Sequence, residues 1–153
     1  MNINLAGKKL LILGGAFQHR KVVETAKKMG IITYVTDYLD IKDSPAKQIA
    51  DNPYMYDIND INKLYDLCKK ENIDGIVAPY LDITQKPYQV LCARLNYSCF
   101  GNLEQHKILT NKSLFKRFCE KHGADVIPYY REEEITDLNI CKDKVKFPIL
   151  IKP

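Results

Sequence analysis

The stretch KKLLILGGAFQHRKVVETAKKMGIITYVTD, residues 8–37, decides the fold of this chain. It opens on a short apolar run that ends in Gly14 and Gly15, which is typical of a buried strand followed by a tight turn. Apolar residues then recur at the i, i+4, i+7 spacing of a helix up to Gly30, where a glycine commonly ends a helix. A β-branched run, typical of a strand, follows and closes at Asp37. The order strand, helix, strand predicts one βαβ unit.

The same alternation continues to about residue 101. Further strands are expected at residues 54–56, 73–78 and 98–100, and further helices from 61 to 68, with Asn59 or Asp60 as the cap, and from about 84 to 95, with Pro87 in the first turn. Strands that alternate with helices predict a parallel sheet with helices on both faces. Because crossovers are right-handed, the sequence predicts a doubly wound, Rossmann-like α/β domain over residues 1–101.

After Gly101 the pattern changes. Helices are expected over residues 103–109 and 113–122, and strands over 126–130 and 147–151. The last of these, FPILI, is strongly apolar and precedes Lys152 and Pro153. A strand needs partners, so this segment predicts a sheet beyond the first domain.

Composition excludes several classes of protein. The 153 residues are 46% hydrophobic and 27% charged, which is typical of a folded globular chain. The net charge is +4, but the lysines are scattered, so we expect no nucleic-acid partner. No apolar run approaches the roughly 20 residues of a membrane helix, and the run before Gly14 is too short for a signal peptide. A cytoplasmic protein without a membrane partner is therefore expected.

The cysteines and histidines do not predict a metal or disulfide site. The five cysteines are odd in number and widely spaced, there is no C-x-x-C motif, and the three histidines show no metal spacing. We expect most of the cysteines to be small buried hydrophobic residues.

Three elements at the carboxyl ends of the predicted strands are candidate binding residues, because open parallel sheets bind ligands there. Gly14 and Gly15 would let the backbone approach a ligand, with an anion-favouring helix N-terminus behind them, but a plain tight turn is about as good an interpretation. Asp37 stands where a dinucleotide-binding fold puts its ribose ligand, or is an ordinary loop residue. Asp82 could face a substrate, or cap the next helix, which is slightly favoured.

Four segments together resemble the ATP-grasp ligases, most of all their carbamoyl-phosphate-synthase-like members. They are TDYLDIKDSPAKQIAD, NIDGIVAPYLD, TNKSLFKRFCEKHGADVIPYY and FPILIKP. The strongest part is N-K-x-x-F-K about forty residues before P-x-x-x-K-P. The resemblance implies a pre-ATP-grasp domain over residues 1–101 and the start of an α+β ATP-grasp domain over 102–153, cut before its phosphate loop.

The resemblance also implies roles for particular residues. Lys112 would contact an ATP phosphate, and Lys152 would lie against the nucleotide. Gly14, Gly15, Asp37 and Asp82 become candidates for the acceptor substrate. The activity implied is the ATP- and Mg²⁺-dependent joining of a carboxylate or bicarbonate to an amine through an acyl phosphate, in a protein that is a dimer.

We expect no catalytic nucleophile, general base or metal ligand in the chain, so the chain by itself is expected to be inactive. The alternative function is a Rossmann-like nucleotide- or dinucleotide-binding module without catalysis, using Gly14, Gly15 and Asp37.

Overall fold

The computed structural model describes residues 4–130, 136 and 148–150. The chain divides into two compact units, Met1–Lys112 and Ser113–Pro153. The helix of residues 103–110 falls in the first unit, whereas the division expected from the sequence puts it in the second. The domain boundary after residue 101 stays a prediction.

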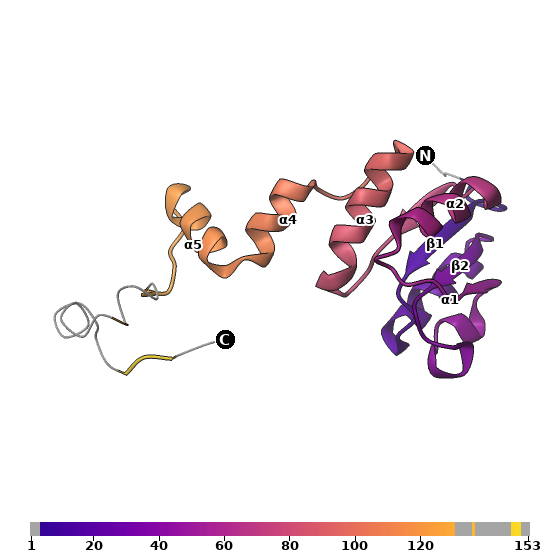
Figure 1. Cartoon of the computed structure of the whole chain (residues 1–153), viewed down its shortest axis with the longest axis horizontal. Coiled ribbons are helices and arrows are strands. Elements are labelled where there is room, and N and C mark those ends of the chain that lie inside the picture. The colour runs from indigo at the N-terminus through magenta and orange to yellow at the C-terminus, as the bar shows by residue number, and fades with distance from the viewer. Residues whose placement is uncertain (1–3, 131–135, 137–147, 151–153) are drawn as a thin grey trace. The chain divides into compact units, whose positions relative to one another are not determined.

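A parallel sheet forms the centre of the first unit (Figure 1). Its strands are β1 (Lys9–Leu13), β2 (Ile32–Thr36), β3 (Asn52–Tyr54) and β4 (Gly75–Val77), in the spatial order β3-β2-β1-β4. Leu13 pairs with Thr36, and Ile12 pairs with Val77, so the carboxyl ends of β1, β2 and β4 meet at one edge. All neighbours are parallel, as the strand–helix alternation predicts.

Helices connect these strands and continue past them. They are α1 (Arg20–Lys28), α2 (Ile61–Glu71), α3 (Asp82–Leu95), α4 (Leu103–Thr110) and α5 (Lys112–Lys121), with short 3-10 helices η1 (Phe17–His19), η2 (Ile41–Asp43) and η3 (Lys47–Ile49). Gly30 follows α1 with φ +74°, the left-handed conformation that ends many helices. Asp60 caps α2 by accepting a hydrogen bond from the Lys63 N–H, which decides between the two expected caps.

The sheet has a hydrophobic core on each face. Side chains alternate along β1, so Leu11 and Leu13 face one side and Ile12 faces the other. Leu11 and Leu13 pack in one cluster with residues of α2 and α3, and Ile12 packs in another with Val23 of α1 and Ala46. All five are fully buried, and each large apolar side chain contributes about 1.5–3 kcal/mol by leaving water. The doubly wound α/β fold is confirmed.

Two cysteines belong to the first core. Cys68 and Cys92 are buried, and burial raises the pKa of their thiols to about 12 and about 11. They therefore stay protonated at neutral pH and behave as small apolar side chains. Cys99 and Cys119 are partly exposed, and Cys141 lies outside the described residues.

The start of α3 differs from expectation. The helix begins at Asp82, two residues earlier than expected, so Pro87 lies inside it and not in its first turn. Proline has no N–H, so the carbonyl of Ile83 lacks its usual helical partner there. Asp82 does not cap the helix, because Leu81 occupies the N-cap position and Asp82 is the first helical residue. Its exposed carboxylate lies at the positive end of the helix dipole.

Two expected strands are wrong, and a third is wrong in its described part. Residues 98–100, 126–130 and 148–150 have no strand assignment, while 147 and 151 lie outside the described residues. Each segment has an apolar, strand-like composition, but a strand forms only by pairing, and among the described residues these segments pair with nothing in a sheet. The strand expected at 54–56 is displaced to Asn52–Tyr54 by its register with β2.

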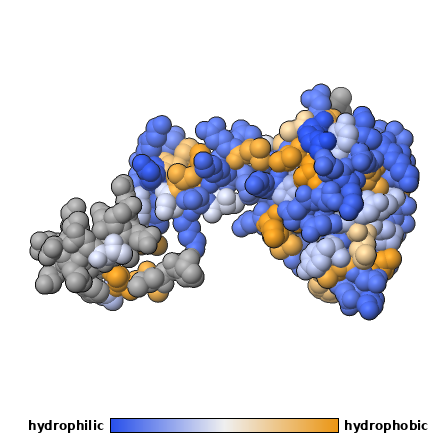
Figure 2. Space-filling model, viewed as in Figure 1, coloured by the Kyte–Doolittle hydropathy of each residue, from blue (hydrophilic) through white to orange (hydrophobic). Residues whose placement is uncertain are grey.

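Figure 2 shows a surface of mainly hydrophilic residues, interrupted by separate hydrophobic areas. Large exposed apolar side chains include Phe17, Tyr38 and Tyr80, which come from loops after three different strands. No helix within the described part of the chain is long and apolar enough to span a membrane.

Candidate functional site at the carboxyl edge of the sheet

The strand order predicts a ligand-binding position at one point on the carboxyl edge of the sheet. From β1 the chain moves to β2 and β3 on one side, and then crosses to β4 on the other side. The loops after β1 and β4 therefore leave the sheet in opposite directions, and this is where open α/β sheets bind ligands. The first loop holds Gly14 and Gly15, and the second holds Pro79 and Tyr80.

Gly14 needs to be glycine. Its φ is +108°, a conformation that other residues rarely adopt. A Cβ at this position would also lie 2.8 Å from Nε2 of His19. The Gly14 N–H donates to the Thr36 carbonyl at 2.8 Å, which ties the loop to the end of β2.

Gly15 is constrained by space alone. A Cβ there would lie 1.9 Å from Ser44 Oγ and 2.0 Å from Asp37 Oδ2, both buried side chains. The Gly15 carbonyl accepts a hydrogen bond from the Ala46 N–H at 2.9 Å, and Ser44 Oγ lies 3.3 Å from the same carbonyl. The segment after β2 therefore packs directly beneath the glycine loop.

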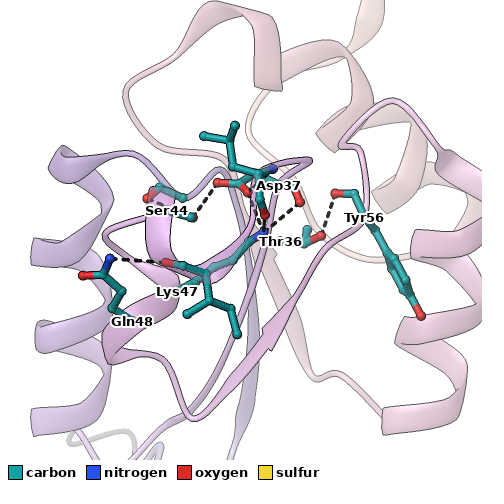
Figure 3. A network of polar contacts seen from close by, with 9 residues as sticks. Thr36, Asp37, Ser44, Lys47, Gln48 and Tyr56 are labelled. Atoms are coloured by element: carbon teal, nitrogen blue, oxygen red, sulfur yellow. Dashed lines mark hydrogen bonds and ion pairs between the residues drawn. The ribbon is translucent and has the colours of Figure 1, made fainter.

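Asp37 is the centre of a buried polar network (Figure 3). Its Oδ2 accepts from Ser44 Oγ at 2.7 Å, and its Oδ1 accepts from the Leu39 N–H at 2.9 Å. Lys47, which is 1% exposed, pairs with the same Oδ1 at 2.6 Å. The carboxylate thus faces Gly15 and the protein interior. Its ribose-binding role stays a prediction.

His19 joins the two loops of the site. Its ring is fully buried, and Nε2 lies 3.1 Å from the Pro79 carbonyl. A carbonyl only accepts, so Nε2 carries the hydrogen, and Nδ1 is buried without a hydrogen-bond partner. Burial lowers the pKa of His19 below 6.5, against smaller opposing effects of the Pro79 and Ala16 carbonyls and of Asp37. The neutral imidazole is therefore the form that the fold stabilises.

Tyr80 packs against this histidine. Its ring meets His19 edge to face, with ring centroids 5.9 Å apart. Its φ is +70°, which is uncommon for a bulky residue and often marks a functional loop. The site thus combines a glycine loop, a buried histidine and a strained tyrosine from two elements on either side of the strand crossing.

The structure brings some of the sequence candidates together. Gly14, Gly15 and Asp37 form one cluster, and Asp82 is the first residue of α3, two residues beyond Tyr80. Sequence reasoning missed His19, Ser44 and Lys47. Nothing in the local pattern singles out Lys47, because a lysine in a polar loop is normally exposed.

Comparison with known proteins identifies the family. Residues 10–85 match the family model described as PylC-like, N-terminal domain. A formate-dependent phosphoribosylglycinamide formyltransferase from Sulfurisphaera tokodaii is 33% identical over 148 residues, which cover 95% of this chain and 36% of that enzyme. The chain belongs to the ATP-grasp ligase superfamily.

Solved structures agree with this membership. The N5-carboxyaminoimidazole ribonucleotide synthetase from Thermotoga maritima is 27% identical, with a TM-score of 0.67 over 86% of this chain and 36% of that chain. An ADP complex of another such synthetase is 25% identical, with a TM-score of 0.67 over 87% and 34% of the two chains. The present chain thus spans little more than a third of the ATP-grasp proteins it matches.

The residues that the ATP-grasp resemblance assigns to ATP lie elsewhere in the chain. Lys112 is the first residue of α5 and is exposed. A lysine at a helix N-terminus is mildly unfavourable for the helix, since the helix dipole is positive there. Lys152 lies outside the described residues. Within residues 4–130, 136 and 148–150, no group of three or more histidine, cysteine or acidic side chains is placed to hold a metal ion.

Proposed function

We propose that this chain forms the N-terminal part of an ATP-dependent ligase that joins a carboxylate, or bicarbonate, to an amine through an acyl phosphate. The observation that carries the proposal is the match of 95% of the chain to a formate-dependent formyltransferase, together with the glycine loop at the strand crossing.

The acceptor substrate would bind at the glycine loop. Gly14 and Gly15 leave the backbone without side chains at the edge of the sheet, just before η1 and α1. Tyr80, on the second loop, and Asp82, at the start of α3, would face the same ligand. These residues bind and orient, and none of them is placed to act as a nucleophile, so the chemistry would depend on position and charge stabilisation.

ATP would be held by lysines. Lys112 and Lys152 would neutralise part of the triphosphate charge, because a lysine is a mobile point charge suited to phosphate oxygens. Mg²⁺ would supply positive charge that stabilises the charge developing during phosphoryl transfer. We assign no metal ligand to this chain. The solved relative in complex with ADP supports nucleotide use in the family.

The setting of the enzyme is also part of the proposal. We expect a cytoplasmic homodimer that acts on small carboxylates and amines, without nucleic-acid or membrane partners.

The alternative is a Rossmann-like binding module without catalysis. That function needs Asp37 to reach a ribose. The network around Asp37 weighs against it, because both carboxylate oxygens already accept bonds from inside the protein.

ATP affinity tests the proposed role of the two lysines. In the protein made from the complete reading frame, Lys112→Ala and Lys152→Ala should each weaken ATP binding by roughly tenfold or more, the value of one charge-assisted hydrogen bond. Affinity for the acceptor should change less. Calorimetric titration measures both, and Lys121→Ala, at the other end of α5, is the matched control. Unchanged ATP binding in both variants would show that the assignment is wrong.

A further inference from the structure

Lys47 is the first residue of η3 and is buried, although lysine side chains are normally exposed. Its ammonium has three hydrogens and three acceptors: Asp37 Oδ1 at 2.6 Å, the Asp37 carbonyl at 2.9 Å and the Leu39 carbonyl. Its side chain has no exposed surface. Every donor is used inside the protein, so Lys47 has no group left for a ligand or for water.

Asp37, the ion-pair partner of Lys47, packs against the buried side of Gly15. Asp37 Oδ2 and Ser44 Oγ occupy the space that a side chain on Gly15 would need. The Ala46 N–H donates to the Gly15 carbonyl, and Ser44 Oγ lies 3.3 Å from the same carbonyl while donating its hydrogen to Asp37 Oδ2. The same short segment, residues 44–47, thus supplies the hydroxyl and the ammonium that bind Asp37 and the N–H that binds Gly15. Figure 3 shows Ser44 and Lys47 on either side of Asp37.

We propose that Lys47 is a positioning residue for the Gly14–Gly15 loop. In this proposal Asp37 packs against the buried side of Gly15 and supports the loop. An isolated carboxylate is costly to bury, so Asp37 lies under Gly15 only because Lys47 neutralises it. The pair fixes the path of residues 44–47, and these fix the Gly15 carbonyl. This inference rests on the proposed function only for what the loop binds.

Charge pairing makes the proposal testable without a ligand. Removing one partner leaves the other charged and unpaired in the interior, whereas removing both leaves a neutral, similarly shaped pair. Lys47→Met keeps the length of the side chain. Asp37→Asn keeps the shape of its side chain, with an oxygen that can accept from the Leu39 N–H and an amide that can donate to Ser44 Oγ. The double variant should therefore protect the amides of the glycine loop better than either single variant does. Two independent structural defects would instead add up, and the double variant would then be the least protected.

Amide hydrogen exchange of the 153-residue chain measures the stability of the glycine loop directly. The reporters are the N–H groups of Ala46 and Gly14, which donate to the Gly15 and Thr36 carbonyls. In each single variant these two amides should exchange roughly a hundredfold faster than in the wild type. In the double variant most of the protection should be restored. The Val35 amide in β2 reports on global unfolding, and Lys28→Met, on the exposed side of α1, is the matched control.

The outcomes separate the proposal from its alternatives. Fast exchange in the single variants with recovery in the double variant supports it. If a single variant does not fold, a folded double variant with wild-type protection at Ala46 supports it as well. Unchanged amide exchange in both single variants would overturn the proposal. So would a double variant whose Ala46 and Gly14 amides are no better protected than in the single variants. Because no substrate is used, either result is independent of whether the protein is a ligase.

Discussion

Three residues show how strongly the glycine loop is tied to its surroundings. Gly14 is held to β2 through Thr36, Gly15 is held to the segment after β2 through Ala46, and His19 connects the loop to the carbonyl of Pro79. A loop fixed on three sides loses little conformational entropy when a ligand binds, so it is pre-organised for binding. The buried Nδ1 of His19 shows that this arrangement leaves one polar atom without a partner.

His19 should make the fold sensitive to acid. The native state lowers its pKa below 6.5, so as the pH falls below about 6.5 the unfolded chain binds a proton before the native chain does. The free energy of unfolding should therefore fall as the pH drops below this value. His19→Gln keeps a donor for Pro79 and cannot be protonated, so this part of the pH dependence should disappear.

Urea denaturation at several pH values measures the effect. His106→Gln, in α4, is the matched control for the loss of a histidine. Identical slopes of stability against pH in the wild type and His19→Gln would show that His19 does not titrate between the two states as argued.

At the scale of elements, the short helix α4 depends on its first turn. The Asn102 side chain accepts from the Gln105 N–H at 2.9 Å, and the Gln105 side chain accepts from the Asn102 N–H at 2.9 Å. This reciprocal capping box satisfies two N–H groups that the helix cannot satisfy itself. None of the residues of α4 is buried, so the cap is a large share of what stabilises the helix.

Asn102→Ala should therefore destabilise α4 by about 1 kcal/mol. Amide exchange at Gln105 and His106 measures the local effect, with Asn102→Ser as the control that retains a side-chain acceptor. Equal protection in Asn102→Ala and the wild type would mean that the cap seen here does not stabilise the helix.

Much of the fold could be predicted from the sequence, because β1, α1 and β2 carry their own periodicity and end signals. The segments at 98–100 and 126–130 could not, since a strand depends on distant partners that a local pattern does not contain. The candidate site divides in the same way. Gly14 and Gly15 are recognisable from their place after a strand, but the burial of Lys47 follows from a tertiary ion pair.

At the scale of the whole molecule, the chain contains a four-stranded parallel sheet with two cores and covers little more than a third of the length of the relatives reported above. One of those solved relatives is an ADP complex, and this chain covers 34% of it. The described residues contain a candidate acceptor site and no metal site. We therefore propose that the acceptor binds to this domain and that the phosphoryl chemistry also needs the rest of an ATP-grasp enzyme.

The 153-residue chain alone should neither hydrolyse ATP nor form an acyl–amine bond, because phosphoryl transfer requires charge stabilisation and the described residues assemble no metal site that would supply it. A phosphate-release assay with Mg²⁺ and ATP checks this, with the Lys112→Ala/Lys152→Ala chain as the background. Mg²⁺-dependent release above that background would contradict the division of labour proposed here.

The central claim, ligation through an acyl phosphate, is tested most directly by following oxygen. The protein from the complete reading frame would be given Mg²⁺, ATP, ¹⁸O-labelled formate and phosphoribosylglycinamide, the substrates named by the relative. A carboxylate oxygen that attacks the terminal phosphorus stays with that phosphorus when the amine displaces phosphate. We predict one ¹⁸O atom in the inorganic phosphate, detected by mass spectrometry. Turnover that releases only unlabelled phosphate would contradict the account.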